Sequence, residues 1–311
     1  MKRFLPHLVA FLVVAIWGTT FVCTKLLLLG GLTPAQIFIL RFIIAYLLLL
    51  GYSLVRGIRW LSNCWQDELL MVALGVTGGS LYFLTENSAM NYTTTTNTSI
   101  IVSLCPLFAS AIIGLFFRSQ RLNRLQTVGT LMAAAGVVVV VMNGHFVLHL
   151  SPLGDALAFA ACLCWAFYSL LMIPANIRYD TVFVTRKVFF YGLVSMIPYL
   201  IVHPELNVHL LLDQPVLMWN LLFLGCVASM LCFLAWNWAL KQLGAVVVTN
   251  YVYLNPVTTI VFAWLLLAEE ITPWFILGTV LILLGMYLAD RHSHIRVPHC
   301  RRTGVRRLRS E

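Results

Sequence analysis

Ten apolar segments, each close to the length that spans a lipid bilayer, constrain this chain more than any other feature. Their approximate bounds are 7–29, 34–55, 67–90, 93–117, 124–143, 152–174, 182–202, 215–239, 244–268 and 273–290. About 20 consecutive apolar residues are enough for one transmembrane helix. Because the connections are short, we expect all function to lie within the membrane or at its two faces.

The composition supports an all-α polytopic membrane protein. The chain is 61% hydrophobic and only 10% charged, whereas a soluble domain carries about 25% charged residues. The apolar runs are continuous rather than alternating, which favours helices over a barrel. The first run continues past Trp17 without a cleavage site, so we interpret it as a retained helix and not a signal peptide.

The net charge of +9 is better explained by membrane topology than by nucleic-acid binding, because the cations occupy short loops and the tail. Placing the N-terminus inside puts most of them inside. These are Lys2, Arg3, Arg56, Arg59, Arg118, Arg121, Arg124, Arg178, Lys241 and the arginines after Asp290. The pattern predicts that both termini are cytoplasmic.

The chain contains an internal duplication. Residues 81–106 return 150 positions later as residues 231–256, with eight identical positions, where roughly three would be expected by chance. Trp17 has a counterpart in Trp165, and a pair of glycines seven residues apart occurs near the end of each copy. We therefore predict a first five-helix repeat over 1–145, a second over 150–290, and a basic cytoplasmic tail over 291–311.

Five helices per repeat is an odd number, so the two repeats must be inserted in opposite orientations. The loop at 118–124, RSQRLNR, is basic, and its counterpart at 268–273, AEEITP, is acidic. Opposite charge at equivalent loops is what inverted repeats require. The fold class is therefore ten transmembrane helices arranged as two inverted five-helix repeats, with the paired glycines expected to pack helix 5 closely on helix 10.

Several of these features together resemble the EamA branch of the drug/metabolite transporter superfamily. They are AIWGTTFV in the first helix, a proline midway along helices 4 and 9, and the closing LLLAEEITPWFILGTVLILLGMYLA. The resemblance implies a secondary transporter, usually bacterial and so in the inner membrane, that often exports amino acids or other metabolites through a central cavity. Gln120 stands where the family commonly has Glu, which argues against a symmetric role for Glu269 and Glu270.

Glu86 is the most informative single residue, because a carboxylate inside a membrane helix is costly unless it is paired, protonated or facing a cavity. It is our candidate for substrate contact and for coupling to protons. A structural ion pair with Arg41 or Lys25 is the alternative. For Arg41 itself we expect the side chain to snorkel towards the interface.

Asn87 and Asn237 occupy equivalent positions in the two repeats and are expected near the midplane, where carriers with inverted repeats bind substrate. Hydrogen bonding between helices is an equally good interpretation. Aromatic residues complete the predicted cavity wall, which would suit amphipathic solutes. They are Trp17, Trp165, Tyr168, Trp236 and Tyr251, although packing alone explains any single one of them.

Pro106 and Pro256 predict kinks in helices 4 and 9 that are candidates for gating bends. The leading functional hypothesis is a secondary transporter for small metabolites that works by alternating access of the two repeats. An uncoupled facilitator or channel and a multidrug efflux carrier are the alternatives. We expect no cofactor, no metal site and no catalytic group, since neither a nucleotide-binding motif nor a hydrolase motif occurs. Monomer and homodimer are both open.

Overall fold

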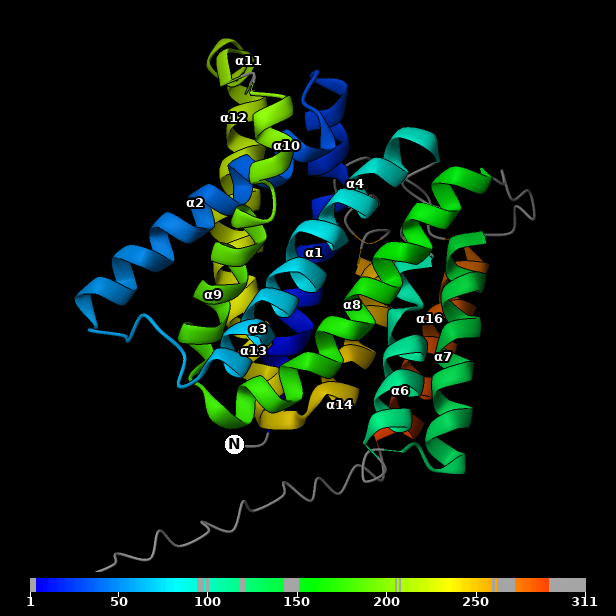
Figure 1. The fold of residues 1–311 in the computed structure, drawn as a ribbon. Coiled ribbons are helices and arrows are strands. Elements are labelled where there is room, and N and C mark those ends of the chain that lie inside the picture. The colour runs from blue at the N-terminus through cyan, green and yellow to red at the C-terminus, as the bar shows by residue number, and fades with distance from the viewer. Residues whose placement is uncertain are drawn as a thin grey trace, which may run out of the picture.

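The computed structural model describes residues 4–93, 98, 101–117, 121–142, 151–204, 206, 208–258, 261 and 272–290. This part of the chain is helical and contains no strand (Figure 1). The predicted tail, 291–311, and the loop residues Gln120, Glu269 and Glu270 lie outside the described residues.

The helices follow the apolar segments. The first half contains α1 (Phe4–Leu29), α2 (Pro34–Val55), the run α3 (Trp65–Gly75), η1 (Val76–Ser80) and α4 (Leu81–Tyr92), then α6 (Cys105–Phe116) and α7 (Arg124–Met142). The second half contains α8 (Pro152–Arg178), α9 (Thr181–Val194), α10 (Ile197–Val202), α11 (Val208–Asp213), the run α12 (Pro215–Leu222), η3 (Phe223–Leu231) and α13 (Cys232–Leu243), then α14 (Ala245–Asn250), η4 (Tyr251–Leu254) and α16 (Pro273–Asp290).

Six continuous helical runs among the described residues are long and apolar enough to cross a membrane, and three shorter apolar helices accompany them. The ninth expected segment, 244–268, is described only to residue 258 and at 261. The helical membrane fold is thus established, while the count of ten spans stays a prediction.

Local sequence explains where helices begin. Pro34 opens α2, and the Thr33 hydroxyl accepts a hydrogen bond from the backbone N–H of Gln36 while the Gln36 side chain accepts one from Thr33. This reciprocal arrangement satisfies two donors that a helix start leaves unpaired. Asp180 caps α9 in a similar way through the N–H of Val182.

The packing interleaves the two halves of the chain. The run α3–η1–α4 lies against α8 and α9, and the run α12–η3–α13 lies against α1 and α2. Close backbone approaches mark both crossings, with Gly75 against Gly192 and Gly225 against Arg41. The third helix of each predicted repeat is therefore packed on the first two helices of the other repeat.

The paired glycines join α7 to α16, as the sequence predicts, and the two helices lie side by side at one edge of the molecule (Figure 1). A Cβ added at Gly129 would lie 2.6 Å from the carbonyl oxygen of Gly285, and one at Gly136 would lie 2.8 Å from that of Gly278. Only a residue without a side chain permits this contact.

A wide, π-helical turn interrupts the third helix of each half. It spans Val76–Ser80 in η1 and Phe223–Leu231 in η3, so the two segments overlap when the 150-residue offset is applied. Turns of this kind often occur at functional sites. The residue pattern does not predict them.

Candidate functional site

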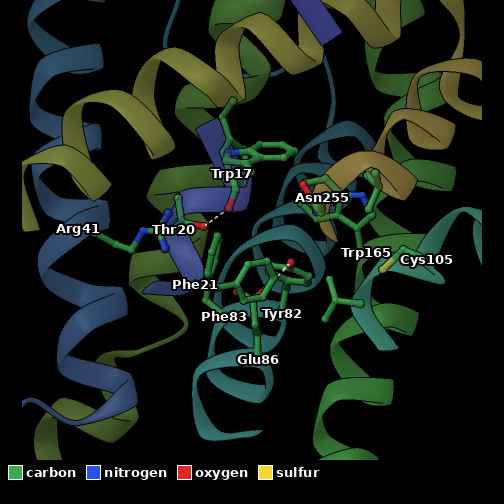
Figure 2. Close-up of a pocket in the computed structure, with 13 residues that line it drawn as sticks. Trp17, Thr20, Phe21, Arg41, Tyr82, Phe83, Glu86, Cys105, Trp165 and Asn255 are labelled. Carbon is green, nitrogen blue, oxygen red and sulfur yellow. Dashed lines mark hydrogen bonds between the residues drawn. The ribbon is translucent and has the colours of Figure 1, made fainter. Parts of the chain in front are cut away.

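A small pocket with a cavity volume of about 30 Å³ lies where the two halves of the chain meet (Figure 2). Thirteen residues line it, namely Trp17, Thr20, Phe21, Arg41, Tyr82, Phe83, Glu86, Val102, Cys105, Trp165, Phe233, Val252 and Asn255.

Eight of these residues form four pairs at equivalent positions of the duplication. The pairs are Trp17 with Trp165, Phe83 with Phe233, Val102 with Val252, and Cys105 with Asn255. Because both repeats contribute equivalent residues to its wall, the pocket lies between the two repeats rather than inside one of them. Substrate sites of carriers with repeated halves occupy this kind of position.

Trp17 and Trp165, both predicted, face each other with ring centroids 5.4 Å apart. The indole N–H of Trp17 donates to the carbonyl oxygen of Ala228, 3.0 Å away in η3. The N–H of Trp165 is buried and has no hydrogen-bond partner among the described residues. Two matched residues therefore have different hydrogen-bonding states.

Trp236, Tyr168 and Tyr251 lie behind or beyond the lining. Trp236 is fully buried with its ring 4.9 Å from that of Trp17, and Tyr168 packs 5.3 Å from Trp165. Tyr251 is at the start of η4, where its hydroxyl lies 2.8 Å from Nδ1 of His7. The first two support the pocket wall, whereas Tyr251 connects η4 to the beginning of α1.

Glu86 lines the pocket, and only 7% of it is exposed. The Tyr82 hydroxyl donates to its carboxyl at 2.7 Å. Neither expected cation pairs with it in the described structure, since Lys25 donates to the carbonyl of Met90. The described residues therefore contain no ion-pair contact at Glu86, which lines the cavity together with Arg41.

The expectation that Arg41 snorkels to the interface is wrong. Arg41 is 2% exposed and lines the pocket. Its Nε donates to the Ser229 hydroxyl at 2.9 Å, and its guanidinium lies 4.4 Å from the centre of the Phe83 ring. A hydroxyl on η3 and an aromatic face together hold the charge inside, an arrangement that the seven-residue distance from the helix start does not reveal.

Asn87 and Asn237 are fully buried, and neither lines the pocket. Asn237 accepts from the Tyr168 hydroxyl at 2.7 Å and donates to the Thr185 hydroxyl at 2.9 Å. Asn87 donates to the carbonyl of Pro34 at 3.3 Å. These contacts are hydrogen bonds between helices, which was the alternative interpretation of the pair.

The two prolines follow breaks in their helices. In the first half, the helix is interrupted by a turn at Leu104, just before α6. In the second half, the 3-10 helix η4 comes directly before Asn255. Since proline cannot donate to the preceding turn, such breaks are expected. The helix is thus interrupted just before Pro106 and just before Pro256, while the kinks and their gating role stay predictions.

Several pocket residues were not predicted from the sequence. They are Thr20, Phe21, Arg41, Tyr82, Phe83, Val102, Cys105, Phe233, Val252 and Asn255. Phe83 and Phe233 are identical in the duplication, and Cys105 and Asn255 each directly precede a proline. Both signals were visible, but neither tells which face of a helix looks inward.

Known proteins resemble the chain along nearly its whole length. A model of the EamA-like transporter family matches residues 4–142 and again 152–289. A solved crystal structure superposes with a TM-score of 0.75 at 20% identity, over 94% of this chain and 99% of that one. The latter likeness concerns the fold alone.

Several relatives have names that state a transport role. An uncharacterized transporter of Archaeoglobus fulgidus is 28% identical over 93% of this chain and 98% of its own length. A probable amino-acid metabolite efflux pump of Salmonella typhimurium is 27% identical over 90% and 92%. A probable terminal-alkyne amino-acid exporter of Streptantibioticus cattleyicolor is 26% identical over 73% and 74%.

Proposed function

The chain belongs to the EamA-like transporter family, and from this premise we propose that it exports small amphipathic metabolites, foremost amino acids, through the pocket of Figure 2. It is a multi-pass membrane transporter rather than an enzyme, and the resemblance drawn from its sequence motifs is confirmed. The observation that carries the proposal is the pocket wall, in which four matched pairs surround an unmatched carboxyl and guanidinium.

We propose transport by alternating access of inverted repeats. A pocket whose walls come from equivalent positions can be closed on either side by equivalent motions. Because α3–η1–α4 packs on α8 and α9, and α12–η3–α13 on α1 and α2, the moving bodies would each include helices of both repeats. The breaks before Pro106 and Pro256 are the candidate bends.

Glu86 is the proposed coupling site. A buried carboxyl that faces a cavity can exchange a proton with the solution that the cavity opens to. Uncoupled facilitation is the competing possibility, and it would leave Glu86 to bind substrate alone. The aromatic wall also suits hydrophobic cations, which makes a multidrug carrier the second candidate substrate range.

We place the protein in a bacterial inner membrane with both termini cytoplasmic. Bacterial relatives support this membrane. The orientation is supported by the loop that holds Arg56 and Arg59, which lies beside Arg178 and Tyr179. These cations share one end of the helices, as the positive-inside rule requires.

Flux measurements in proteoliposomes test the proposal. The full chain would be reconstituted and offered labelled amino acids, nucleosides and cationic drugs. Saturable flux of amino acids, accelerated by an opposing pH gradient, is the expected result. Flux that never saturates would identify a channel, and saturable flux confined to cationic drugs would favour the multidrug alternative. Saturable flux that does not depend on pH would rule out proton coupling but would still support a transporter.

A further inference from the structure

The pocket contains two opposite charges that do not pair with each other. Arg41 comes from α2 and Glu86 from α4, and both line the same cavity. Among the described residues they form no ion pair. Opposite charges in a site of low polarity attract strongly, and each of these two groups also has a hydroxyl partner of its own.

Each charged group forms a hydrogen bond with a neutral hydroxyl group. The Ser229 hydroxyl accepts from Nε of Arg41 at 2.9 Å, and the Tyr82 hydroxyl donates to Oε1 of Glu86 at 2.7 Å. Neither contact cancels the charge. The Arg41 bond uses Nε, so the planar end of the guanidinium, which suits a carboxylate, is not engaged by it.

None of these four side chains has a counterpart of the same residue type at the equivalent position of the other repeat. With the 150-residue offset, Glu86 corresponds to Trp236, Tyr82 to Cys232, and Ser229 to Gly79. Arg41 corresponds to Val188, because Ile44 packs on Gly225 as Tyr191 packs on Gly75. A scaffold of matched residues thus carries a single set of charges, which gives a bound solute one orientation.

Aromatic side chains form much of the remaining pocket lining, which also includes Thr20, Cys105 and Asn255. Trp17, Trp165, Phe83 and Phe233 line it, and the buried N–H of Trp165 has no partner among the described residues. A buried donor left without an acceptor is costly. The pocket therefore offers an aromatic surface and a few neutral polar groups beside the two charged ones.

We propose that Arg41 binds the carboxylate and Glu86 the ammonium group of an α-amino acid, whose apolar or aromatic side chain lies against the tryptophans. A zwitterion complements both charges at once, whereas a cation or an anion leaves one of them buried and uncompensated. Ser229 and Tyr82 are positioning residues for the two charged groups. This inference rests on the proposed export function and names its substrate class.

Three probes that share one ring test the inference with the purified full-length protein. L-Phenylalanine carries both charges, phenethylamine lacks the carboxylate, and 3-phenylpropionate lacks the ammonium group. We expect each one-charge probe to bind about tenfold or more weakly than phenylalanine, as loss of a charged contact requires. Equal binding of phenethylamine and phenylalanine would overturn the inference without any variant.

Variants of Arg41 and Glu86 test which charged group of the solute each residue binds. Arg41→Gln should weaken phenylalanine and 3-phenylpropionate about tenfold or more but leave phenethylamine near its wild-type affinity. Glu86→Gln should do the reverse. A uniform loss for all three probes would mean that the residues only maintain the fold. Ser229→Ala, which keeps the guanidinium, provides a second variant if Arg41→Gln does not fold, and it should weaken the two carboxylates preferentially.

Transport separates this inference from the function on which it rests. If the proteoliposome panel shows saturable flux, the inference predicts that every transported solute carries both charges. Saturable flux of a solute with one charge would overturn the inference and leave the transporter intact. Absence of flux for the entire panel would overturn the proposed function itself.

Discussion

Trp17 and Trp165, equivalent residues of the two repeats, meet edge to face with ring planes at 87°. Only the first has its N–H satisfied, by Ala228 at 3.0 Å. The duplication has therefore preserved the residue while changing its role. Trp17 links α1 to η3 through this hydrogen bond, whereas the buried N–H of Trp165 has no partner among the described residues.

This asymmetry predicts different effects of the same change. Trp17→Phe removes a hydrogen bond and leaves a buried carbonyl, which should lower stability by about 1–3 kcal/mol beyond the packing loss. Trp165→Phe removes a similar volume without breaking a bond to the described residues. Thermal unfolding in detergent should rank Trp17→Phe below Trp165→Phe. The opposite ranking would contradict the assigned roles.

Tyr82→Phe tests the positioning of Glu86. Without the hydroxyl the carboxyl is freer to rotate, so the KM for an amino acid should rise several-fold while the protein still folds. Tyr253→Phe is a matched control, because the Tyr253 hydroxyl is buried and has no partner among the described residues. Equal effects of the two changes on KM would show that the bond to Glu86 does not matter.

The contact between α7 and α16 predicts a strong dependence on glycine. A Cβ at Gly285 would lie 2.5 Å from the backbone nitrogen of Ala133, so Gly285→Ala should destabilise by about 1–3 kcal/mol through overpacking. Gly51→Ala is the control, since nothing lies within 4 Å of its added Cβ. Unfolding curves that coincide for both variants would refute the tight packing.

The ion pair between Glu68 and Lys187 joins α3 to α9 and is largely buried, with side chains 14% and 8% exposed. Removing one partner leaves a buried charge, so Glu68→Gln should cost about 3 kcal/mol or more. Arg178, which pairs with Asp67, is 53% exposed, and Arg178→Gln should cost much less. Chemical or thermal unfolding of both variants measures the two losses of stability. A larger loss for Arg178→Gln than for Glu68→Gln would contradict the prediction.

The sequence predicted the scaffold better than the site. The length of the apolar segments, the charge of the loops and the duplication depend on composition and spacing, which can be read from the sequence alone. Trp17, Trp165 and Glu86 were found because a large aromatic or a carboxylate inside a membrane helix needs an explanation.

The remaining pocket residues depend on which way a helix faces. Asn87 and Asn237 adjoin the predicted site in sequence, yet they turn towards neighbouring helices. Arg41 turns inward because Ser229, 188 residues away, receives it. The π-helical turns in η1 and η3 change which face of the helix the following residues occupy. Nothing in the residue pattern at Val76–Ser80 predicts such a turn.

Trans-stimulated exchange in proteoliposomes tests the central claim most directly, namely that solute crosses through the pocket containing Glu86. Labelled phenylalanine outside is measured with and without unlabelled phenylalanine inside, for the wild type and for Glu86→Gln. The account predicts saturable uptake that internal substrate accelerates, and its loss in the folded variant. Unchanged exchange by Glu86→Gln, or uptake that neither saturates nor responds to internal substrate, would contradict it.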